Sequence, residues 1–565
     1  MKYADWIVDF LLQKGITDAF GLPGGVILEL LYAMDRRKGE FSAHLSYHEQ
    51  AAAFSACGYA QAKGLPGVAY ATRGPGFTNL VTGIADAYYD SIPTLFFTAH
   101  SVTRELSDMR IQADQELDPI PLASGITKAA IRVEKAEDVI PELERAYTLA
   151  TSGRKGPVLL DFRTALFSEE LHRPETPRKP SAAECTPSFA EIAASIRSHL
   201  KAAYRPVLLI GSGVRQSQTT EQVRSFAEAN EIPVISSRIA QDAMPDSPMY
   251  FGYIGSHGTR YGNFILSKAD LVIALGNRMS YPLRSSSFEP TMSPKKVIRI
   301  DIDNAEFHRE IPNSINYAVP LQQLLPHLLP CRMPYHNSRG WLAVCNRLKD
   351  SLWQADTAPP VNAISAFLRT VPPDAIITGD VGNAEFWLSR AYTHAGCRQP
   401  ILYSNSFGAL GCSLAKAIGA HYATGNPVIC FAGDQGLQLN IQELQAISSN
   451  RLPILIVLIN NRASGMIRCH EEQRFGRNFV HTTEESGYLT PDFSAIASAY
   501  RLNYVSARAD NEASLPPFTR CSLPCLVEVS VDEEVCLQPN LLKGQPCQAL
   551  SPALPETLYG ALDAL

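Results

Sequence analysis

The sequence predicts an α/β protein built from three doubly wound parallel-sheet domains. Its 565 residues exceed what one hydrophobic core normally holds, so about three globular units are expected. Along the whole chain, short hydrophobic runs rich in β-branched residues alternate with longer segments of helical periodicity. This alternation is typical of parallel strands joined by crossover helices.

Two polar, proline-bearing stretches divide the chain. Residues 172–188 and the region from Pro326 to Gly340 have the composition of linkers. The domains predicted from them are 1–175, 188–330 and 355–545, followed by a C-terminal tail at 546–565.

The first domain is expected to begin with a packed amphipathic helix. Its apolar face consists of Trp6, Ile7, Phe10 and Leu11. Asp5 and Asp9 interrupt any secretory hydrophobic region. Residues 67–72 are a candidate buried strand, followed by a Gly-Pro-Gly turn and a helical segment.

The other two domains repeat the pattern of short hydrophobic runs. In the central domain the expected strands are 206–213, 233–237, 271–276 and 297–303. In the third domain they are 375–380, 428–433 and 453–461. Three parallel sheets are therefore expected.

Composition limits the function classes. Charged residues make up 19% of the chain and the net charge is −6, so the basic excess that nucleic-acid binding needs is absent. The apolar run at 452–459 is too short to span a bilayer. The twelve cysteines are scattered without zinc-ribbon or thioredoxin spacing, which favours reduced thiols in a cytoplasmic protein.

Two polar side chains mark a candidate ligand site. Asp434 and Asn461 each follow a predicted strand, and the segment between them is long enough for one crossover helix. Ligands of open parallel sheets gather beyond the carboxyl ends of the strands, so these side chains could share one ion. Carboxylate and amide oxygens suit Mg²⁺, which often also binds phosphate. Both residues could instead be ordinary strand-end caps.

The motifs around this pair carry a resemblance to a known family. "GDQG", "LNIQELQAI" and "LPILIVLINN" resemble the thiamine-diphosphate (ThDP) signature, in which GDG is followed by NN. "YHEQAAAFSACGYAQAKG", "ATSGRKGPVLLDF" and "FGALGCSLAKAIGA" are similar to the acetolactate synthase group, and the resemblance covers most of the chain. It implies pyrimidine-binding, central and diphosphate-binding domains in that order.

The resemblance also implies roles for individual residues. Glu49 matches the glutamate that promotes loss of the thiazolium C2 proton, and Gln115 and Leu410 match further catalytic positions. Asp434, Asn461 and the Ala463 carbonyl match the metal ligands. The other implied cofactor contacts are Pro23, Gly24, Val381, Gly382, Asn383, Ala384, Gly408, Gln435, Gly436, Ser464, Gly465 and Met466. On pattern alone, Leu410 and Met466 would be core residues.

The chain departs from the acetolactate synthase pattern at several positions. Gln435 replaces a small residue in the diphosphate turn, where a close backbone approach to phosphate favours Gly. His470 replaces a tryptophan and Asp114 a phenylalanine, while the expected acceptor arginine aligns near Pro282, with Arg284 close by. Asp114 and His470 could also be surface residues. The implied substrate positions are Gly25, Asp114, Gln115, Ile467 and His470.

These departures favour a neutral or polar acceptor over a second 2-oxo acid. The expected function is a ThDP- and Mg²⁺-dependent carboligase that decarboxylates a 2-oxo acid, pyruvate first, and transfers the acyl unit to an aldehyde or ketone. The downstream segments 484–500 and 527–542 resemble ThDP carboligases of sugar and secondary-metabolite clusters. Acetolactate synthase, a simple 2-oxo acid decarboxylase and a non-catalytic paralogue remain alternatives.

Two further expectations follow from the resemblance. The turns at 211–213, 255–258 and 276–278 resemble flavin contacts, although "PLQQL" replaces an expected Gly-Asp, so either FAD or a vestigial central domain is expected. Because Glu49 and the metal residues lie in different domains, which come from different subunits in the family, a homodimer or homotetramer is expected.

Overall fold

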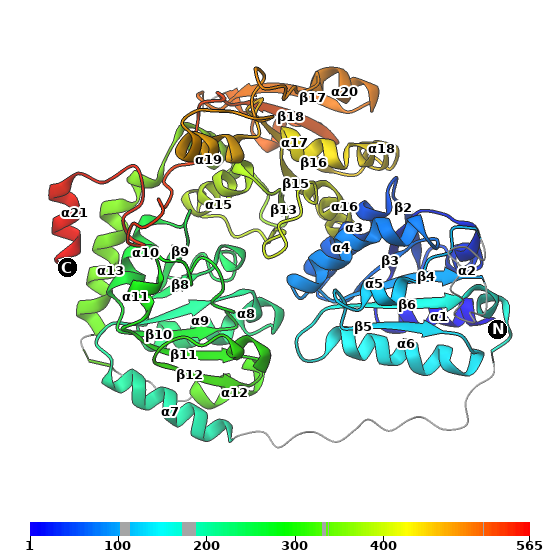
Figure 1. Cartoon of the computed structure of the whole chain (residues 1–565), viewed down its shortest axis with the longest axis horizontal. Helices are drawn as coiled ribbons and strands as arrows, with labels where there is room; N and C mark the ends of the chain where they lie inside the picture. Colours follow the sequence, from blue (N-terminus) through cyan, green and yellow to red (C-terminus); the bar gives the residue numbers. More distant parts are fainter. Residues whose placement is uncertain (102–113, 172–187, 330–334, 337, 512–513) are drawn as a thin grey trace.

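The computed structural model describes residues 1–101, 114–171, 188–329, 335–336, 338–511 and 514–565. It contains three six-stranded sheets, each of them entirely parallel and flanked by helices (Figure 1). The predicted α/β class with three doubly wound parallel sheets is confirmed. The expected linker at 172–188 lies almost entirely outside the described residues.

The first unit has the strand order β2-β1-β3-β4-β6-β5. Its strands are β1 (Asp18–Gly21), β2 (Ser42–Leu45), β3 (Gly67–Tyr70), β4 (Thr94–His100), β5 (Ala129–Val133) and β6 (Pro157–Arg163). Its helices are α1 (Tyr3–Gln13), α2 (Leu28–Arg36), α3 (Glu49–Lys63), α4 (Pro75–Tyr89), α5 (Pro119–Ala123) and α6 (Ala136–Thr151). Alternate residues of β4 enter opposite cores: Leu95 and Phe97 face one, and Phe96 faces the other.

The central unit has the strand order β12-β11-β10-β7-β8-β9. Its strands are β7 (Pro206–Ile210), β8 (Val234–Ser236), β9 (Tyr250–Tyr253), β10 (Leu271–Leu275), β11 (Lys296–Asp301) and β12 (Ser314–Ala318). Its helices are α7 (Phe189–Ala202), α8 (Ser212–Gln216), α9 (Thr220–Ala229), α10 (Arg260–Lys268), α11 (Glu289–Met292), α12 (Leu321–Leu328) and α13 (Ser338–Leu352).

The third unit has the strand order β14-β13-β15-β16-β18-β17. Its strands are β13 (Ile376–Gly379), β14 (Ile401–Leu402), β15 (Val428–Gly433), β16 (Ile454–Asn460), β17 (Asn503–Arg508) and β18 (Cys525–Ser530). Its helices are α14 (Pro359–Leu368), α15 (Asn383–Ala395), α16 (Ser413–Thr424), α17 (Asp434–Leu439), α18 (Leu444–Ser449), α19 (Gly465–Phe475) and α20 (Phe493–Ala499).

Two further segments pack on the central unit. Pro326 was expected in a linker, but it lies inside α12, whose buried leucines secure that helix to the central core. The C-terminal tail at 546–565 contains α21 (Glu556–Asp563), which packs on the central unit. There Tyr559 contacts Phe264, with ring centroids 5.6 Å apart. In the described part of the chain, buried apolar residues of both segments belong to the core of the central unit.

The first and third units meet along α3 and α16, which lie side by side (Figure 1). A Cβ added to Gly419 would lie 1.8 Å from the Ser55 carbonyl oxygen, and one on Gly58 would lie 2.2 Å from that of Lys416. Only residues without side chains permit this approach. Both sheets contribute to one shared hydrophobic core. In the described part of the chain, no helix is long and apolar enough to cross a membrane.

Candidate active site between the first and third sheets

Asp434 lies where the sequence predicts, at the carboxyl end of β15 and as the first residue of α17. Strands β15 and β16 are parallel neighbours, with Gly433 paired to Ile459, so Asp434 and Asn461 emerge at the same edge. Burial raises the pKa of Asp434 to about 7, although the Gln435 N–H, at 3.0 Å, favours the ionised form. A cation at this edge would favour the carboxylate.

Several buried polar atoms gather beside Asp434 without partners. In the described part of the chain, Oδ2 of Asp434, Nδ2 of Asn461 and both amide atoms of Asn383 have no hydrogen-bond partner. Asn383 and Asn461 converge, because a Cβ added to Gly465 would lie within 2.8 Å of both amide nitrogens. Buried groups of this kind need partners. A metal ion with a diphosphate would supply acceptors for the amides and a cation for the carboxylate, so these residues fit that ligand.

Gln435 does not have a backbone conformation that requires glycine. It is the second residue of α17 with an ordinary negative φ, and its exposed side chain accepts a hydrogen bond from Ser464 Oγ at 3.2 Å. The residue of this turn that lies close to a neighbouring side chain is the next one, Gly436. A Cβ on Gly436 would lie 3.0 Å from the Asp380 carboxylate, so Gly436 is the position that must stay small.

Asp380 is a site residue that the sequence analysis missed. It is buried after β13, and its carboxylate accepts hydrogen bonds from Val381 N and Gly411 N, both at 2.8 Å, and from Ser413 Oγ at 2.9 Å. Asp380 therefore fixes two loops that carry expected cofactor contacts, 381–384 and 408–411. Asp380 accepts hydrogen bonds from residues about thirty positions away, and no local sequence pattern reveals such partners.

Glu49 is the first residue of α3 and is 6% exposed. His48 caps this helix by accepting the Gln50 N–H at 3.1 Å. The Glu49 carboxylate accepts a hydrogen bond from Asn79 Nδ2 on α4 at 2.9 Å. The Glu49 carboxyl group is therefore buried and held in place by one neutral amide.

The start of α3 lies beside the loop that carries Leu410. Ala51 shares a buried cluster with Ala409 and Cys412, the residues on either side of that loop position. Leu410 is half-buried, and Gly408 is exposed with φ at +67° and open space around it. The structure thus brings Glu49 of the first unit and Leu410 of the third unit to one junction within a single chain.

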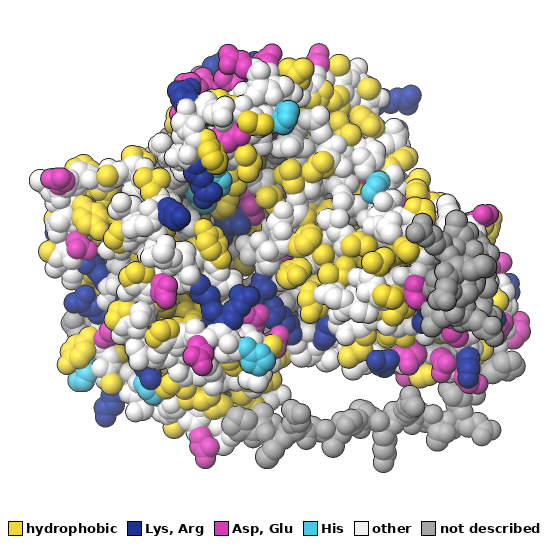
Figure 2. All heavy atoms as spheres, in the orientation of Figure 1, with side chains coloured by type: hydrophobic (Ala, Val, Ile, Leu, Met, Phe, Trp, Pro, Cys, Tyr) yellow, Lys and Arg dark blue, Asp and Glu magenta, His cyan; other side chains and the backbone are white. Residues whose placement is uncertain are grey.

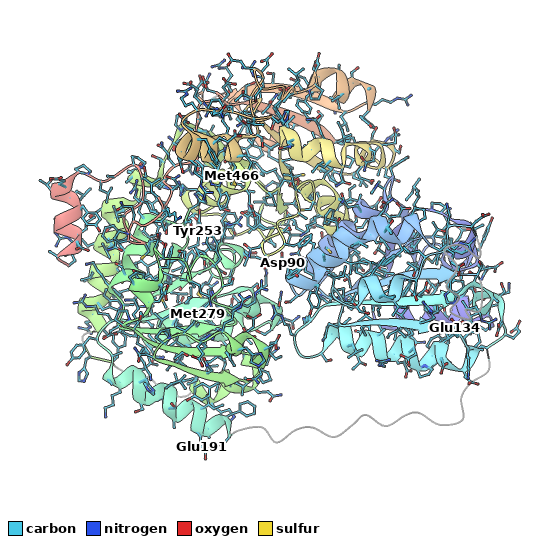
Figure 3. The ribbon with its side chains drawn as sticks, viewed as in Figure 1. Asp90, Glu134, Glu191, Tyr253, Met279 and Met466 are labelled. Atoms are coloured by element: carbon cyan, nitrogen blue, oxygen red, sulfur yellow. A yellow bond between two sulfur atoms is a disulfide. The ribbon has the colours of Figure 1, made fainter. Side chains whose placement is uncertain are left out.

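Asp90 holds the adjoining loop at the junction of all three units (Figure 3). Its carboxylate accepts the backbone N–H groups of Asn405 and Ser406 at 2.8 and 2.9 Å. Its carbonyl accepts a hydrogen bond from Gln216 Nε2 of the central unit at 2.9 Å. One residue at the end of α4 therefore links the first unit to both others.

The remaining expected contacts of the first unit lie on loops. Pro23 and Gly25 are exposed after β1, and Gly24 packs against Thr72. Asp114 and Gln115 are both exposed, which leaves them free to meet a ligand or solvent. Gln115 has φ at +55°, an unusual conformation for a residue with a side chain.

Helix α19 presents the expected acceptor residues. Met466 is partly buried against the third core, whereas Ile467 and His470 are exposed on the same helix. Ala463, an expected metal ligand, and Ser464, an expected cofactor contact, immediately precede this helix, and Ala463 is buried. Residues 463–470 therefore form one continuous segment that leads outwards from the expected metal ligand Ala463.

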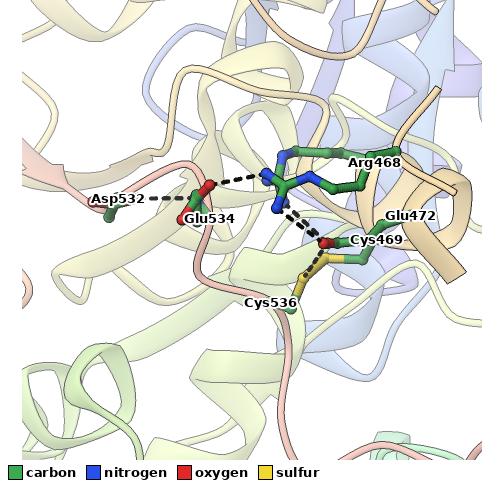
Figure 4. Close-up of a disulfide and its surroundings, with 7 residues drawn as sticks. Arg468, Cys469, Glu472, Asp532, Glu534 and Cys536 are labelled. Carbon is green, nitrogen blue, oxygen red and sulfur yellow. Dashed lines mark hydrogen bonds and ion pairs between the residues drawn. A yellow bond between two sulfur atoms is a disulfide. The ribbon is translucent and has the colours of Figure 1, made fainter. Parts of the chain in front are cut away.

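A disulfide between Cys469 and Cys536 secures the same helix (Figure 4). The expectation that all thiols are reduced is wrong for this pair, because α19 and the segment after β18 bring two distant cysteines to a Cα separation of 6.1 Å. Beside it, Arg468 lies 3.7 Å from the Glu472 carboxylate. The eight other described cysteines are free thiols.

A cavity of about 1030 Å³ opens at the carboxyl end of the central sheet. Lys and Arg side chains gather along this hollow between the first and central units (Figure 2). Arg154, Lys155, Arg238 and Arg278 line it, together with the turns at Gly211, Gly255 and Gly276. Arg284 does not point freely into the site, because its guanidinium donates to the carbonyls of Met279 and Arg309, both at 3.0 Å.

Comparison with known proteins assigns the chain to a family. Residues 1–122 match the N-terminal TPP-binding domain of thiamine pyrophosphate enzymes, residues 193–328 the central domain and residues 380–529 the C-terminal TPP-binding domain. The chain belongs to the thiamine pyrophosphate enzymes. This thiamine pyrophosphate enzyme is 34% identical to the large subunit of acetolactate synthase isozyme 2 of Escherichia coli (strain K12), over 94% of the chain and 96% of that protein.

Other acetolactate synthases are similarly related to this thiamine pyrophosphate enzyme. It is 34% identical to the isozyme 1 large subunit of the same organism, with 96% of each chain covered. It is 30% identical to the large subunit from Lactococcus lactis subsp. lactis (strain IL1403), over 95% of the chain and 94% of that protein. The predicted resemblance is confirmed: the protein is a ThDP-dependent, acetolactate synthase-like enzyme that transfers an acyl group.

Proposed function

We propose that this enzyme is a Mg²⁺-dependent carboligase that decarboxylates pyruvate and transfers the acyl unit to a neutral aldehyde or ketone. The observation that carries the proposal is the set of buried polar atoms of Asp434, Asn383 and Asn461 that have no partner at the carboxyl edge of the third sheet. Pyruvate is the proposed donor because its acetyl unit is the one named in acetolactate, the product of the related synthases.

Some of these residues would bind the metal ion and the diphosphate, and Glu49 would hold a proton. Asp434, Asn461 and the Ala463 carbonyl would hold Mg²⁺, while Asn383 and the 381–384 loop would meet the diphosphate. When bound, ThDP supplies the carbanion chemistry that decarboxylation and acyl transfer require. The Glu49 carboxylate would hold a proton at the pyrimidine ring. The burial of Glu49 and Asp434 keeps bulk water away from these groups.

We propose a neutral acceptor because Arg284, near the expected acceptor position, is already engaged by other groups. Arg284, the arginine nearest the expected acceptor position, is engaged by two backbone carbonyls. His470 and Asp114 are exposed polar residues where the acetolactate synthase pattern has aromatic ones. A second 2-oxo acid would need a cation for its carboxylate, whereas an aldehyde or ketone would not.

Product analysis with pyruvate, ThDP and Mg²⁺ tests the proposal. We expect little turnover with pyruvate alone and a new carbon–carbon bond once aldehydes or keto-sugars are added. Acetolactate from pyruvate alone would identify the protein as an acetolactate synthase, and acetaldehyde alone would identify a simple decarboxylase. Calorimetry that detects no ThDP binding would favour a non-catalytic paralogue.

Two accompanying proposals concern the cavity and the assembly. The basic cavity at the end of the central sheet fits an anionic dinucleotide, and FAD is the candidate. A flavin absorption band in the purified protein would support it, and colourless protein that takes up no FAD would contradict it. We also infer a homodimer or homotetramer, with shared active sites as in the family, which the mass of the native protein in solution tests.

A further inference from the structure

Glu443 is a buried carboxyl group that the mechanism above does not use. It ends the short 3-10 helix Ile441–Glu443 between α17 and α18 and is 1% exposed. Its Oε1 accepts the backbone N–H of Tyr47 at 2.8 Å, and the next N–H, that of His48, also stabilises the carboxylate. A side chain of the third unit therefore holds the backbone that leads directly into Glu49.

A second bond fastens the same place. Asn440, on the same segment as Glu443, donates from Nδ2 to Gln50 Oε1 at 3.2 Å and to the Gly411 carbonyl at 2.9 Å. Residues on both sides of Glu49 are thus tied to residues 440–443, and this segment is also tied to the loop of Leu410. Because α17 runs from Asp434 to Leu439, one short helix separates the expected metal ligand from Asn440 and its bond to Gln50.

The electrostatic setting explains why the group at position 443 is a carboxyl group. The first N–H groups of a helix and the residues before it present positive partial charge, which an acidic side chain neutralises. Burial raises the pKa of Glu443 to about 7, and the two N–H groups oppose that rise by favouring the ionised form. A neutral amide could accept from these donors but would bring no charge.

We propose that Glu443 is a positioning residue that sets where the Glu49 carboxylate is presented to the cofactor. This inference rests on the proposed function, since it assigns Glu443 a task in the reaction of Glu49. It acts through the backbone of Tyr47 and His48 rather than by touching a reacting atom. A displacement of about 1 Å at a catalytic group can lower a rate about 100-fold, so the anchor has a measurable consequence.

The first test uses the protein without cofactor. Hydrogen exchange is followed at the amides of Tyr47 and His48 in the parent and in Glu443→Gln. We expect exchange at these two amides to rise about 10-fold in the variant, since a neutral acceptor replaces a charge-assisted one and a loss of about 1.4 kcal/mol corresponds to a factor of ten. Unchanged protection would overturn the anchor, whether or not the enzyme turns over pyruvate.

The second test uses the loaded enzyme. For Glu443→Gln we expect ThDP and Mg²⁺ affinity within about 3-fold of the parent, an unchanged KM for the 2-oxo acid, and a kcat lower by about 10- to 100-fold. Glu443→Asp, which keeps the charge but shortens its reach, should recover part of that loss. When Glu443→Gln is added to Glu49→Gln, kcat should fall little further, because both substitutions act through the carboxyl group of Glu49.

The controls separate this inference from the proposed function. Asp270 of the central unit makes the same pattern of bonds, accepting the N–H groups of Tyr204 and Arg205 at 2.8 and 2.9 Å. Asp270→Asn should leave both kcat and exchange at Tyr47 unchanged.

If Glu443→Gln has the same kcat as the parent enzyme, the positioning role is overturned, while the proposed carboligase activity stands. If Glu443→Gln does not fold, a kcat of Glu443→Asp equal to that of the parent enzyme overturns the positioning role equally. A parent that neither binds ThDP nor consumes pyruvate refutes the proposed function instead.

Discussion

Asp86 on α4 and Lys416 on α16 form an ion pair at 2.8 Å in which neither side chain is exposed, and the pair joins the first unit to the third. Lys416 also donates to the Tyr403 carbonyl, and Asp86 accepts from the Ser404 hydroxyl. Burial disfavours the ammonium, yet the charge of Asp86 raises the pKa of Lys416 above its usual value. Each charge therefore depends on the other.

Lys416→Met should leave Asp86 as an uncompensated buried charge. We expect the free energy of unfolding to fall by about 3 to 5 kcal/mol, measured by urea denaturation at neutral pH. The double variant Asp86→Leu with Lys416→Met removes both charges and should lie much closer to the parent. Equal stability of Lys416→Met and the parent would show that the pair is not buried in solution.

The contact between α3 and α16 predicts a steric effect at Gly419. Gly419→Ala places a methyl group against the Ser55 carbonyl and should destabilise the protein by about 1 to 3 kcal/mol or more through overpacking. Gly560 on α21 has open space around it, so Gly560→Ala should be neutral or stabilising by about 0.5 to 1 kcal/mol. Thermal unfolding of both variants checks the contrast. Similar shifts for both would contradict the close helix contact.

Glu443 predicts a pH dependence of stability. Its folded pKa of about 7 lies above the ordinary value of 4.5, so its contribution is fully present below pH 4.5 and is lost as the pH rises through 7. Relative to Glu443→Gln, the parent should lose up to about 3 kcal/mol of unfolding free energy between pH 5 and pH 8. Urea titrations of both proteins across this range measure the difference, and parallel curves would contradict it.

The disulfide between Cys469 and Cys536 predicts a redox-dependent stability. It closes a loop over a sequence separation of 67 residues, so its removal by Cys536→Ser should lower the free energy of unfolding by about 2 to 4 kcal/mol in non-reducing buffer. With excess dithiol the parent and the variant should converge. Peptide mapping without reductant checks the link directly, and free thiols at both positions in air-oxidised protein would contradict it.

Much of the fold could be predicted from local pattern. Runs such as Pro206–Ile210 and Ile454–Asn460 are buried on both faces, so their composition alone indicates central parallel strands. The segment after Asp434 was expected to be long enough for one crossover helix between parallel neighbours, and β15 and β16 are parallel neighbours, but the crossover is not one continuous helix. It breaks into α17, a 3-10 turn and α18, because Asn440 leaves the helix to bind Gln50 and Gly411.

The candidate site was predicted only where motifs carry it. Glu49, Asp434 and Asn461 stand in recognisable motifs; the structure places Glu49 at the start of α3 and brings Asp434 and Asn461 to one edge of the third sheet. Asp380 and Glu443 were missed, since their partners are backbone N–H groups of distant segments, up to 396 residues away. The expectation that position 435 favours glycine came from the diphosphate turn of the family, whereas here Gln435 lies within a helix.

The most direct test of the account is the rate of pyruvate decarboxylation by Glu49→Gln with saturating ThDP, Mg²⁺ and acceptor. The substitution keeps the size of the side chain and its place at the start of α3 but removes the proton-carrying carboxyl group. We expect ThDP still to bind and the rate to fall by about 100-fold or more. A variant that consumes pyruvate at the parent rate would contradict the assignment of Glu49, and with it the proposed mechanism.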